Sequence, residues 1–220
     1  DMARLITRQN GSPIRWSQAA QAAAPAAMYA IAAQIARSFP FEERRDGLKN
    51  PVLIRREPVG VVAAVVPWNV PEFVTSLKLG PALAAGCTVV LKPSPETPLD
   101  ANLLAEVADE AGLPAGVLSV LPAGREVSEY LVSHPGIDKV SFTGSVAAGK
   151  RVMEVAAGNL TRVTLELGGK SAALILPDAD LDAAVAAITA APGLSTVGRR
   201  VSRSPGSWLL ALATRKWPSG

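Results

Sequence analysis

Short runs rich in Val and Ile alternate with helical segments along most of this 220-residue chain, and this alternation restricts the folds that it can form. Strands are predicted at residues 61–66, 88–91, 116–121, 139–142, 162–167 and 172–176. Helices are predicted at residues 72–85, 100–111, 126–133, 146–157 and 180–191. Strands joined by such helices pair in parallel, because the helix returns the chain to the end at which the previous strand began. The sequence therefore predicts an α/β fold, a Rossmann-like parallel sheet with flanking helices.

The first 60 residues follow a different pattern. An alanine-rich segment at 16–39 has the period of a helix, and Pro25 is expected to divide or kink it. Residues 52–66 are predicted to form two strands around the turn Pro58-Val59-Gly60. Residues 1–10 are polar and charged and lack the apolar run of a secretory signal, and no apolar stretch of the chain is long enough to span a bilayer.

The net charge of +3 comes from the end of the chain. Residues 193–220 hold five of the 22 basic residues and no acidic residue, so the rest of the chain has 17 basic and 19 acidic residues. This basic tail has no basic helical stripe, repeat or groove-reading motif, so we expect neither nucleic acid nor a membrane as a partner. The single cysteine, Cys87, opens an apolar strand and is predicted to be a small buried residue. It fits a reducing compartment, and we expect a cytoplasmic protein.

Polar residues follow four of the predicted strands. In parallel α/β sheets ligands bind beyond the carboxyl ends of the strands, so these positions carry the most information about function. The four segments are Pro67-Trp68-Asn69, Lys92-Pro93-Ser94, Thr143-Gly144-Ser145 and Gly168-Gly169-Lys170. Gly144 and Ser145 open a helix, where backbone N–H groups and the helix dipole favour an anionic phosphate. One such helix start is weak evidence, but four polar strand ends together indicate a nucleotide site.

Each polar strand end also has an alternative interpretation. Asn69 is placed to donate a hydrogen bond to a developing oxyanion, or it is a turn former next to Pro71. Ser145 is a helix N-cap, a role compatible with phosphate binding. Glu166, in the apolar run V-T-L-E-L-G-G, suits a general base near neutral pH or is a surface residue of an edge strand. His134 has no second His or Cys nearby, so no metal site is expected.

Four motifs in this order, V-V-P-W-N, L-K-P-S, F-T-G-S and L-E-L-G-G-K, closely resemble those of the NAD(P)-dependent aldehyde dehydrogenase family, from about Gly11 to about Ala191. The resemblance implies the family's cofactor-binding domain, incomplete at both ends, with NAD or NADP as cofactor. It also implies oxidation of an aldehyde to a carboxylic acid, and a homo-oligomer in the intact family.

The same resemblance assigns roles to individual residues. Asn69 would belong to the oxyanion hole, and Glu166 would be the general base that activates water. Lys92, otherwise a solvated lysine at a strand end, would reach the adenosine ribose. The residues assigned to cofactor binding are Val66, Pro67, Trp68, Lys92, Gly124, Gly144, Ser145, Gly149, Leu167 and Gly168.

Two positions depart from the family's pattern. The family often has Glu three residues after the lysine, where it holds the ribose hydroxyls. Here that position is Pro95, with Glu96 one step later, which leaves the choice between NAD and NADP open. The family's nucleophilic cysteine should follow Glu166 by 34 positions, where this chain has Arg200.

A frameshift explains the missing cysteine. Shifted codons across residues 194–201 permit Phe-Asn-Ser-Gly-Gln-Ala-Cys, which resembles the family's segment around the cysteine. We therefore expect a partial cofactor-binding domain over residues 1–191 and an out-of-frame, poorly ordered basic tail over residues 192–220. The predicted function is that of an aldehyde dehydrogenase family oxidoreductase whose chain, lacking the nucleophile, is inactive alone. The alternative is a non-catalytic nucleotide-binding fragment or a pseudogene product.

Overall fold

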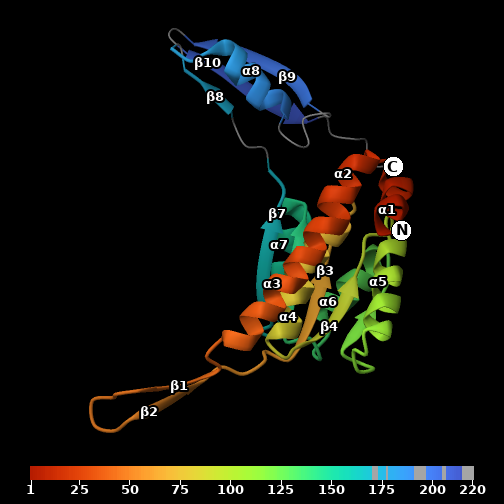
Figure 1. The fold of residues 1–220 in the computed structure, drawn as a ribbon. Coiled ribbons are helices and arrows are strands. Elements are labelled where there is room, and N and C mark those ends of the chain that lie inside the picture. Colours follow the sequence, from red (N-terminus) through yellow and green to blue (C-terminus); the bar gives the residue numbers. More distant parts are fainter. Residues whose placement is uncertain (170–172, 177, 191–196, 205–206, 215–220) are drawn as a thin grey trace. The chain divides into compact units, whose positions relative to one another are not determined.

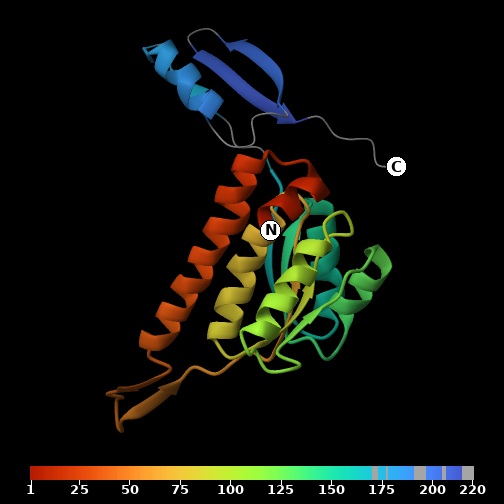
Figure 2. The same cartoon turned by 45° about the vertical axis from the view of Figure 1, so that its right-hand side comes forward.

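The computed structural model describes residues 1–169, 173–176, 178–190, 197–204 and 207–214. The chain divides into two compact units, Asp1–Leu167 and Gly168–Gly220. The first unit holds a five-stranded sheet with helices on both faces, which can be followed in Figures 1 and 2. The predicted α/β architecture is therefore confirmed.

The sheet of the first unit is parallel, as the alternation of strands and helices predicted. Its strand order is β5 (Leu118–Val120), β4 (Thr88–Lys92), β3 (Val61–Val65), β6 (Lys139–Gly144) and β7 (Arg162–Leu167). The chain runs from β3 outward to β4 and β5, and then returns to β6 on the other side of β3. The strand order therefore reverses between β3 and β6, and open α/β sheets bind ligands at such a switch point.

Both faces of this sheet are covered by helices. One face carries α4 (Pro71–Ala84) and α5 (Leu99–Glu110), and the other carries α6 (Arg125–Ser133) and α7 (Val146–Ala157). Along β3, Val62 and Ala64 enter the first hydrophobic core, while Ala63 and Val65 enter the second. This strand is apolar on both sides because neither side meets water. Cys87 belongs to the first core and is 5% exposed, which confirms that it is a buried residue.

Helical segments precede the sheet: α1 (Met2–Asn10), α2 (Ile14–Gln18), the π-helical turn η1 (Ala19–Ala23) and α3 (Ala24–Ser38). Helix α1 was not predicted, because its buried residues, Ala3 and Ile6, are too few to give a periodic signal. It forms by packing against α2, η1 and α5. The predicted interruption near Pro25 takes the form of the π turn, and Pro25 itself lies in the first turn of α3.

The two strands predicted within residues 52–66 both form, but they have different partners. Strand β2 (Val52–Arg55) pairs with β1 (Glu42–Arg45) in an antiparallel hairpin, whereas β3 joins the parallel sheet. Strand β1 was not predicted, because E-E-R-R has no apolar alternation. Its charges pair within the hairpin instead, since Arg45 bonds Glu43 at 2.7 Å and Arg55 bonds Glu42 at 3.0 Å.

The second unit contains β8 (Ala173–Ile175), α8 (Leu181–Ala190), β9 (Val197–Ser204) and β10 (Ser207–Thr214). Its three strands form an antiparallel sheet in the order β8-β10-β9. The strand predicted at residues 172–176 therefore forms as β8, but the prediction that it pairs in parallel is wrong, because its partner is β10. The sequence interpretation expected an extended or poorly ordered tail over residues 192–220, and the structure has the two strands β9 and β10 within it. In β10 only Trp208 and Thr214 are strand-favouring residue types, so its pairing with β8 and β9 accounts for this strand better than local propensity does. The frameshift hypothesis concerns the coding DNA and stays a prediction.

None of the helices in the described part of the chain is both long and apolar enough to cross a bilayer.

Candidate functional site

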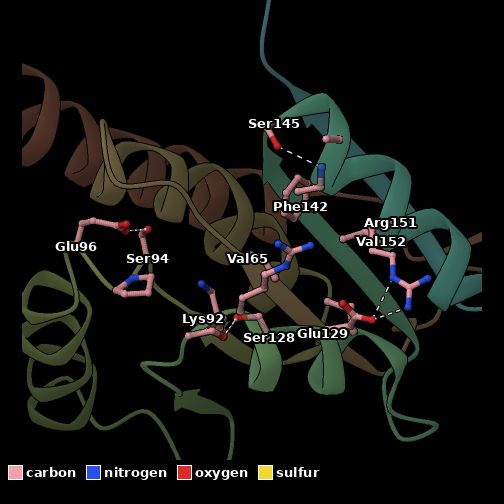
Figure 3. Close-up of a pocket in the computed structure, with 16 residues that line it drawn as sticks. Val65, Lys92, Ser94, Glu96, Ser128, Glu129, Phe142, Ser145, Arg151 and Val152 are labelled. Carbon is pink, nitrogen blue, oxygen red and sulfur yellow. Dashed lines mark hydrogen bonds and ion pairs between the residues drawn. The ribbon is translucent and has the colours of Figure 1, made fainter. Parts of the chain in front are cut away.

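A pocket of about 500 Å³ lies at the carboxyl edge of the parallel sheet. Its floor comes from Val65 of β3 and Phe142 of β6, the two strands that flank the switch point. Its walls come from the loop after β4 and from the first turns of α6 and α7 (Figure 3). Of the ten residues predicted to bind cofactor, Lys92, Gly124 and Ser145 line this pocket.

The first turns of α6 and α7 both border the pocket. Ser145 is the N-cap of α7, and its hydroxyl accepts a hydrogen bond from the Ala148 N–H at 3.1 Å. Gly124 is the N-cap of α6, and its carbonyl accepts a hydrogen bond from the Ser128 hydroxyl at 2.6 Å. Remaining N–H groups of these turns and the positive ends of both helix dipoles attract an anion. The N-cap interpretation of Ser145 is confirmed, and it leaves the pocket suited to phosphate.

Lys92 lines the same pocket and contributes a cation to it, although only 6% of the surface of this residue is exposed. Burial lowers the pKa of the Lys92 amine, and the neighbouring Glu96 carboxylate partly opposes this effect. Glu96 also lines the pocket, and the Ser94 hydroxyl donates a hydrogen bond to its carboxylate. That hydrogen bond is the main reason that the pKa of Glu96 is lowered. The pocket therefore presents both a cation and an anion beside β4.

Two predicted residues act through packing rather than as walls of the pocket. Gly149 is buried on α7, and a Cβ added there would collide with the side chain of Leu167. The missing side chain thus lets α7 lie close to β7. The side chain of Val66 is 3% exposed and sits in the hydrophobic core on the opposite face, so a contact of Val66 with a ligand would use its main chain. Gly144 closes β6, beside Leu167 of β7.

The two predicted catalytic residues lie near the carboxyl ends of β3 and β7, two strands that β6 separates in the sheet. Asn69 lies in the turn after β3, and Glu166 is opposite Thr143 in the pairing of β7 with β6. Strand β7 is an edge strand of the sheet, and Glu166 is exposed within this unit rather than buried in an apolar run. Pro67 is half-buried, and Trp68 is 50% exposed. Gly168 begins the second unit.

Lys78 is a titratable residue beside Glu166 that the sequence interpretation missed. It lies on α4, and its amine donates a hydrogen bond to the Ser141 hydroxyl at 3.0 Å. Burial lowers the pKa of Lys78 to about 8, and the Glu166 carboxylate opposes that shift. The sequence does contain a signal that could have identified Lys78: it is the one charged residue in the run S-L-K-L-G. Lys78 brings a cation toward the carboxylate, and the pKa of this amine lies closer to neutral pH than that of a solvated lysine.

Charged residues on α6 and α7 also line the pocket and were not predicted. Arg151 of α7 pairs with Glu129 of α6 at 2.6 Å and with Glu154 of its own helix at 2.9 Å. These pairs are surface pairs and contribute little stability. Arg125, at the start of α6, adds a further cation to the wall.

Comparisons with known proteins match this geometry. The model of the aldehyde dehydrogenase family matches residues 1–198. Geranial dehydrogenase of Castellaniella defragrans is 49% identical over 185 residues, which are 84% of this chain and 39% of that protein. The solved Mycobacterium tuberculosis aldehyde dehydrogenase in complex with NAD+ is 47% identical, with a TM-score of 0.80 over 84% of this chain and 38% of that one. An NADP-dependent enzyme of E. coli is 38% identical, with a TM-score of 0.81 over 86% of this chain and 40% of that one.

The chain belongs to the aldehyde dehydrogenase family. It spans about two fifths of the length of these relatives. The match begins at residue 1 and ends at residue 198, so it extends beyond the stretch from about Gly11 to about Ala191 that the motifs indicated.

Proposed function

We propose that this chain is the cofactor-binding part of an NAD(P)-dependent aldehyde dehydrogenase. The observation that carries the proposal is the pocket at the switch point, where Lys92 and the first turns of α6 and α7 converge. These groups fit a dinucleotide, since the helix N-termini suit its pyrophosphate and Lys92 suits a ribose hydroxyl or phosphate. Arg125 on the wall is compatible with the extra phosphate of NADP, and Glu96 with the free hydroxyls of NAD.

The catalytic roles of this chain's own residues follow from their places at the strand ends. The nicotinamide ring, when bound, supplies the hydride acceptor. The Asn69 carboxamide would donate a hydrogen bond to the aldehyde oxygen as it becomes negative. Glu166 would take a proton from the water that releases the acid. The covalent nucleophile of the family would come from the reading frame in which position 200 is a cysteine.

Lys92→Ala and Ser145→Pro are each expected to weaken NAD+ or NADP+ binding by about tenfold or more, because each removes a polar contact to the cofactor. Isothermal calorimetry with both nucleotides measures the effect on the 220-residue chain. Lys150→Ala is the control, since Lys150 is exposed on α7 outside the pocket and should leave affinity unchanged. Unchanged affinity in both pocket variants would show that the nucleotide does not bind at this edge of the sheet.

A second candidate is a non-catalytic nucleotide-binding product, and Arg200 at the expected place of the cysteine favours it. Resequencing the DNA that encodes residues 185–200 separates the two candidates. One base inserted or deleted upstream of an intact frame is the result expected for the enzyme. A confirmed sequence that encodes Arg200 and Val201 in a functional gene would leave the non-catalytic product.

We further propose that the intact protein is a homo-oligomer in the cytoplasm. The β1–β2 hairpin supports the first point, because among the described residues its strands pair only with each other, and Leu48, Val52 and Leu53 are exposed on it. The single cysteine supports the second. The aldehyde remains to be identified by a substrate screen on the intact enzyme.

A further inference from the structure

Two side-chain amides hold the main chain of the turn that carries Asn69. We propose that Asn10 and Gln21 are positioning residues for Asn69: they fix the backbone of this turn and thereby the direction of the Asn69 carboxamide. The inference rests on the proposed function, since it takes Asn69 as the donor to the oxyanion. It adds two residues from the first helical segments, which carry none of the motifs described above.

Asn10 bonds two successive carbonyls of the turn. Its Nδ2 donates to the carbonyl of Trp68 at 3.1 Å and to the carbonyl of Asn69 at 3.2 Å. Its Oδ1 accepts a hydrogen bond from the Ser12 N–H at 3.0 Å. The N–H of Ser12 can only donate, so the orientation of the Asn10 carboxamide is determined, with its NH₂ group toward the turn. Asn10 therefore links the end of α1 to Trp68 and Asn69, which lie 58 and 59 positions later in the sequence.

Gln21 bonds the same turn from a second direction. It is fully buried in η1, where the π turn replaces the regular α-helical spacing. Its Oε1 accepts a hydrogen bond from the Phe73 N–H at 3.2 Å, and its Nε2 makes a longer contact of 3.5 Å to the Asn69 carbonyl. Phe73 lies in the first turn of α4, whose N-cap residue Val70 provides no side-chain hydrogen bond. Gln21 thus satisfies an N–H group that a capping side chain would otherwise satisfy.

The turn needs this support because little else restrains it. Trp68 and Asn69 are exposed, and within the described residues the Asn69 carboxamide makes no hydrogen bond of its own. Pro67 and Pro71 restrict their own φ angles and the backbone of the residues before them, Val66 and Val70, but not that of Trp68 or Asn69. The direction of the carboxamide therefore depends on the backbone that Asn10 and Gln21 hold. A displacement of about 1 Å at a reacting group can cost on the order of a hundredfold in rate, so such support bears directly on catalysis.

Hydrogen exchange and NMR on the 220-residue chain test the proposal. Gln21→Met keeps the size of a buried side chain but removes both hydrogen bonds. It should speed exchange of the Phe73 N–H by about tenfold, the usual effect of losing one hydrogen bond. Asn10→Asp keeps the acceptor for Ser12 but removes the donor, and because Asn10 is only half-buried, this variant should fold even if Gln21→Met does not.

The specific signature is the backbone N–H group of Asn69, whose ¹⁵N order parameter should fall in both variants while that of the Asn102 N–H group on α5 stays constant. Gln18→Met is the matched control, since Gln18 is exposed in the same helical segment and should change nothing. An Asn69 backbone that stays rigid in both variants would overturn the proposal, and so would an equal loosening of Asn102. The chain could bind neither NAD+ nor NADP+ and still show the loosening at Asn69 in both variants. That result would contradict the proposed function, but it would support the role of Asn10 and Gln21 in fixing the turn.

Discussion

The 220-residue chain is expected to form no measurable NADH or NADPH from an aldehyde, even when its pocket is saturated with cofactor. Asn69 and Glu166 remain in place, but neither can form the covalent intermediate of the family. In a protease, removing the covalent nucleophile costs about a millionfold in kcat, because the groups that serve it act only as a unit. Cys87 cannot replace the missing nucleophile, since it is 5% exposed and lies in the hydrophobic core between the sheet and the helices α4 and α5.

The matched comparison is a gene in which the shifted frame is restored, so that Cys follows Phe-Asn-Ser-Gly-Gln-Ala and translation continues in that frame. Absorbance of the reduced nicotinamide with a panel of aldehydes should reveal turnover from this product and none from the 220-residue chain. Turnover by the 220-residue chain that survives Cys87→Ala would refute the assignment of the nucleophile.

The stability of the chain is expected to fall as the pH rises from about 5 to about 8, because two carboxyl groups are buried without a cation. Glu72 is 3% exposed and Asp100 is 1% exposed, and no ion pair to either occurs among the described residues. Burial and the nearby Asp100 raise the pKa of Glu72 to about 8, although a hydrogen bond from Tyr29 at 3.2 Å opposes this. Burial raises the pKa of Asp100 to about 6, opposed by a hydrogen bond from Gln9 at 3.0 Å.

The sign follows from proton uptake. A carboxyl group whose pKa is raised in the folded state holds its proton there while the unfolded chain has already lost it. The stabilisation is complete below the ordinary carboxyl pKa and is lost as the pH climbs to the folded-state value. For Glu72 the ordinary value is 4.5 and the folded value about 8, so the loss is on the order of 3–5 kcal/mol.

Glu72→Gln should remove most of this dependence, because the amide keeps an oxygen for the Tyr29 hydroxyl but does not ionise. At pH 8 the variant should be more stable than the parent chain by a few kcal/mol, and at pH 5 about equal or slightly less stable. Urea unfolding followed by circular dichroism between pH 5 and pH 8.5 measures both. Glu106→Gln, at an exposed site on α5, is the control. A parent chain with flat stability over this range would contradict the assignment of Glu72 as a protonated buried acid.

Local sequence was sufficient for the strands and helices around the pocket and for several of its walls, but not for α1, β1 or the two strands after residue 192. Runs of Val and Ile with helices between them predicted the five strands of the parallel sheet, although β8, predicted in the same way, pairs antiparallel with β10. The polar residues that end parallel strands must gather at one edge of the sheet. Lys92 and Ser145 were identified in this way, and both line the pocket. The assignment of Val66 shows the limit of the method. Side chains alternate along a strand, so Val65 faces the pocket while Val66 faces the opposite core.

Other features depend on contacts between residues far apart in the chain, and a local sequence pattern does not predict such contacts. Glu72 and Asp100 look like surface residues in the first turns of two helices. They are buried because the helices before the sheet pack over them, with Gln9 of α1 bonding Asp100 across 91 positions. Gln21 is an isolated polar residue in an alanine-rich segment until η1 brings it against the turn of Asn69. Sequence alone determined the strands and helices that form the pocket and the polar residues at the strand ends. Only the tertiary structure decided which of the other polar groups lose contact with water, because burial depends on the element that packs against a residue and not on its neighbours in the chain.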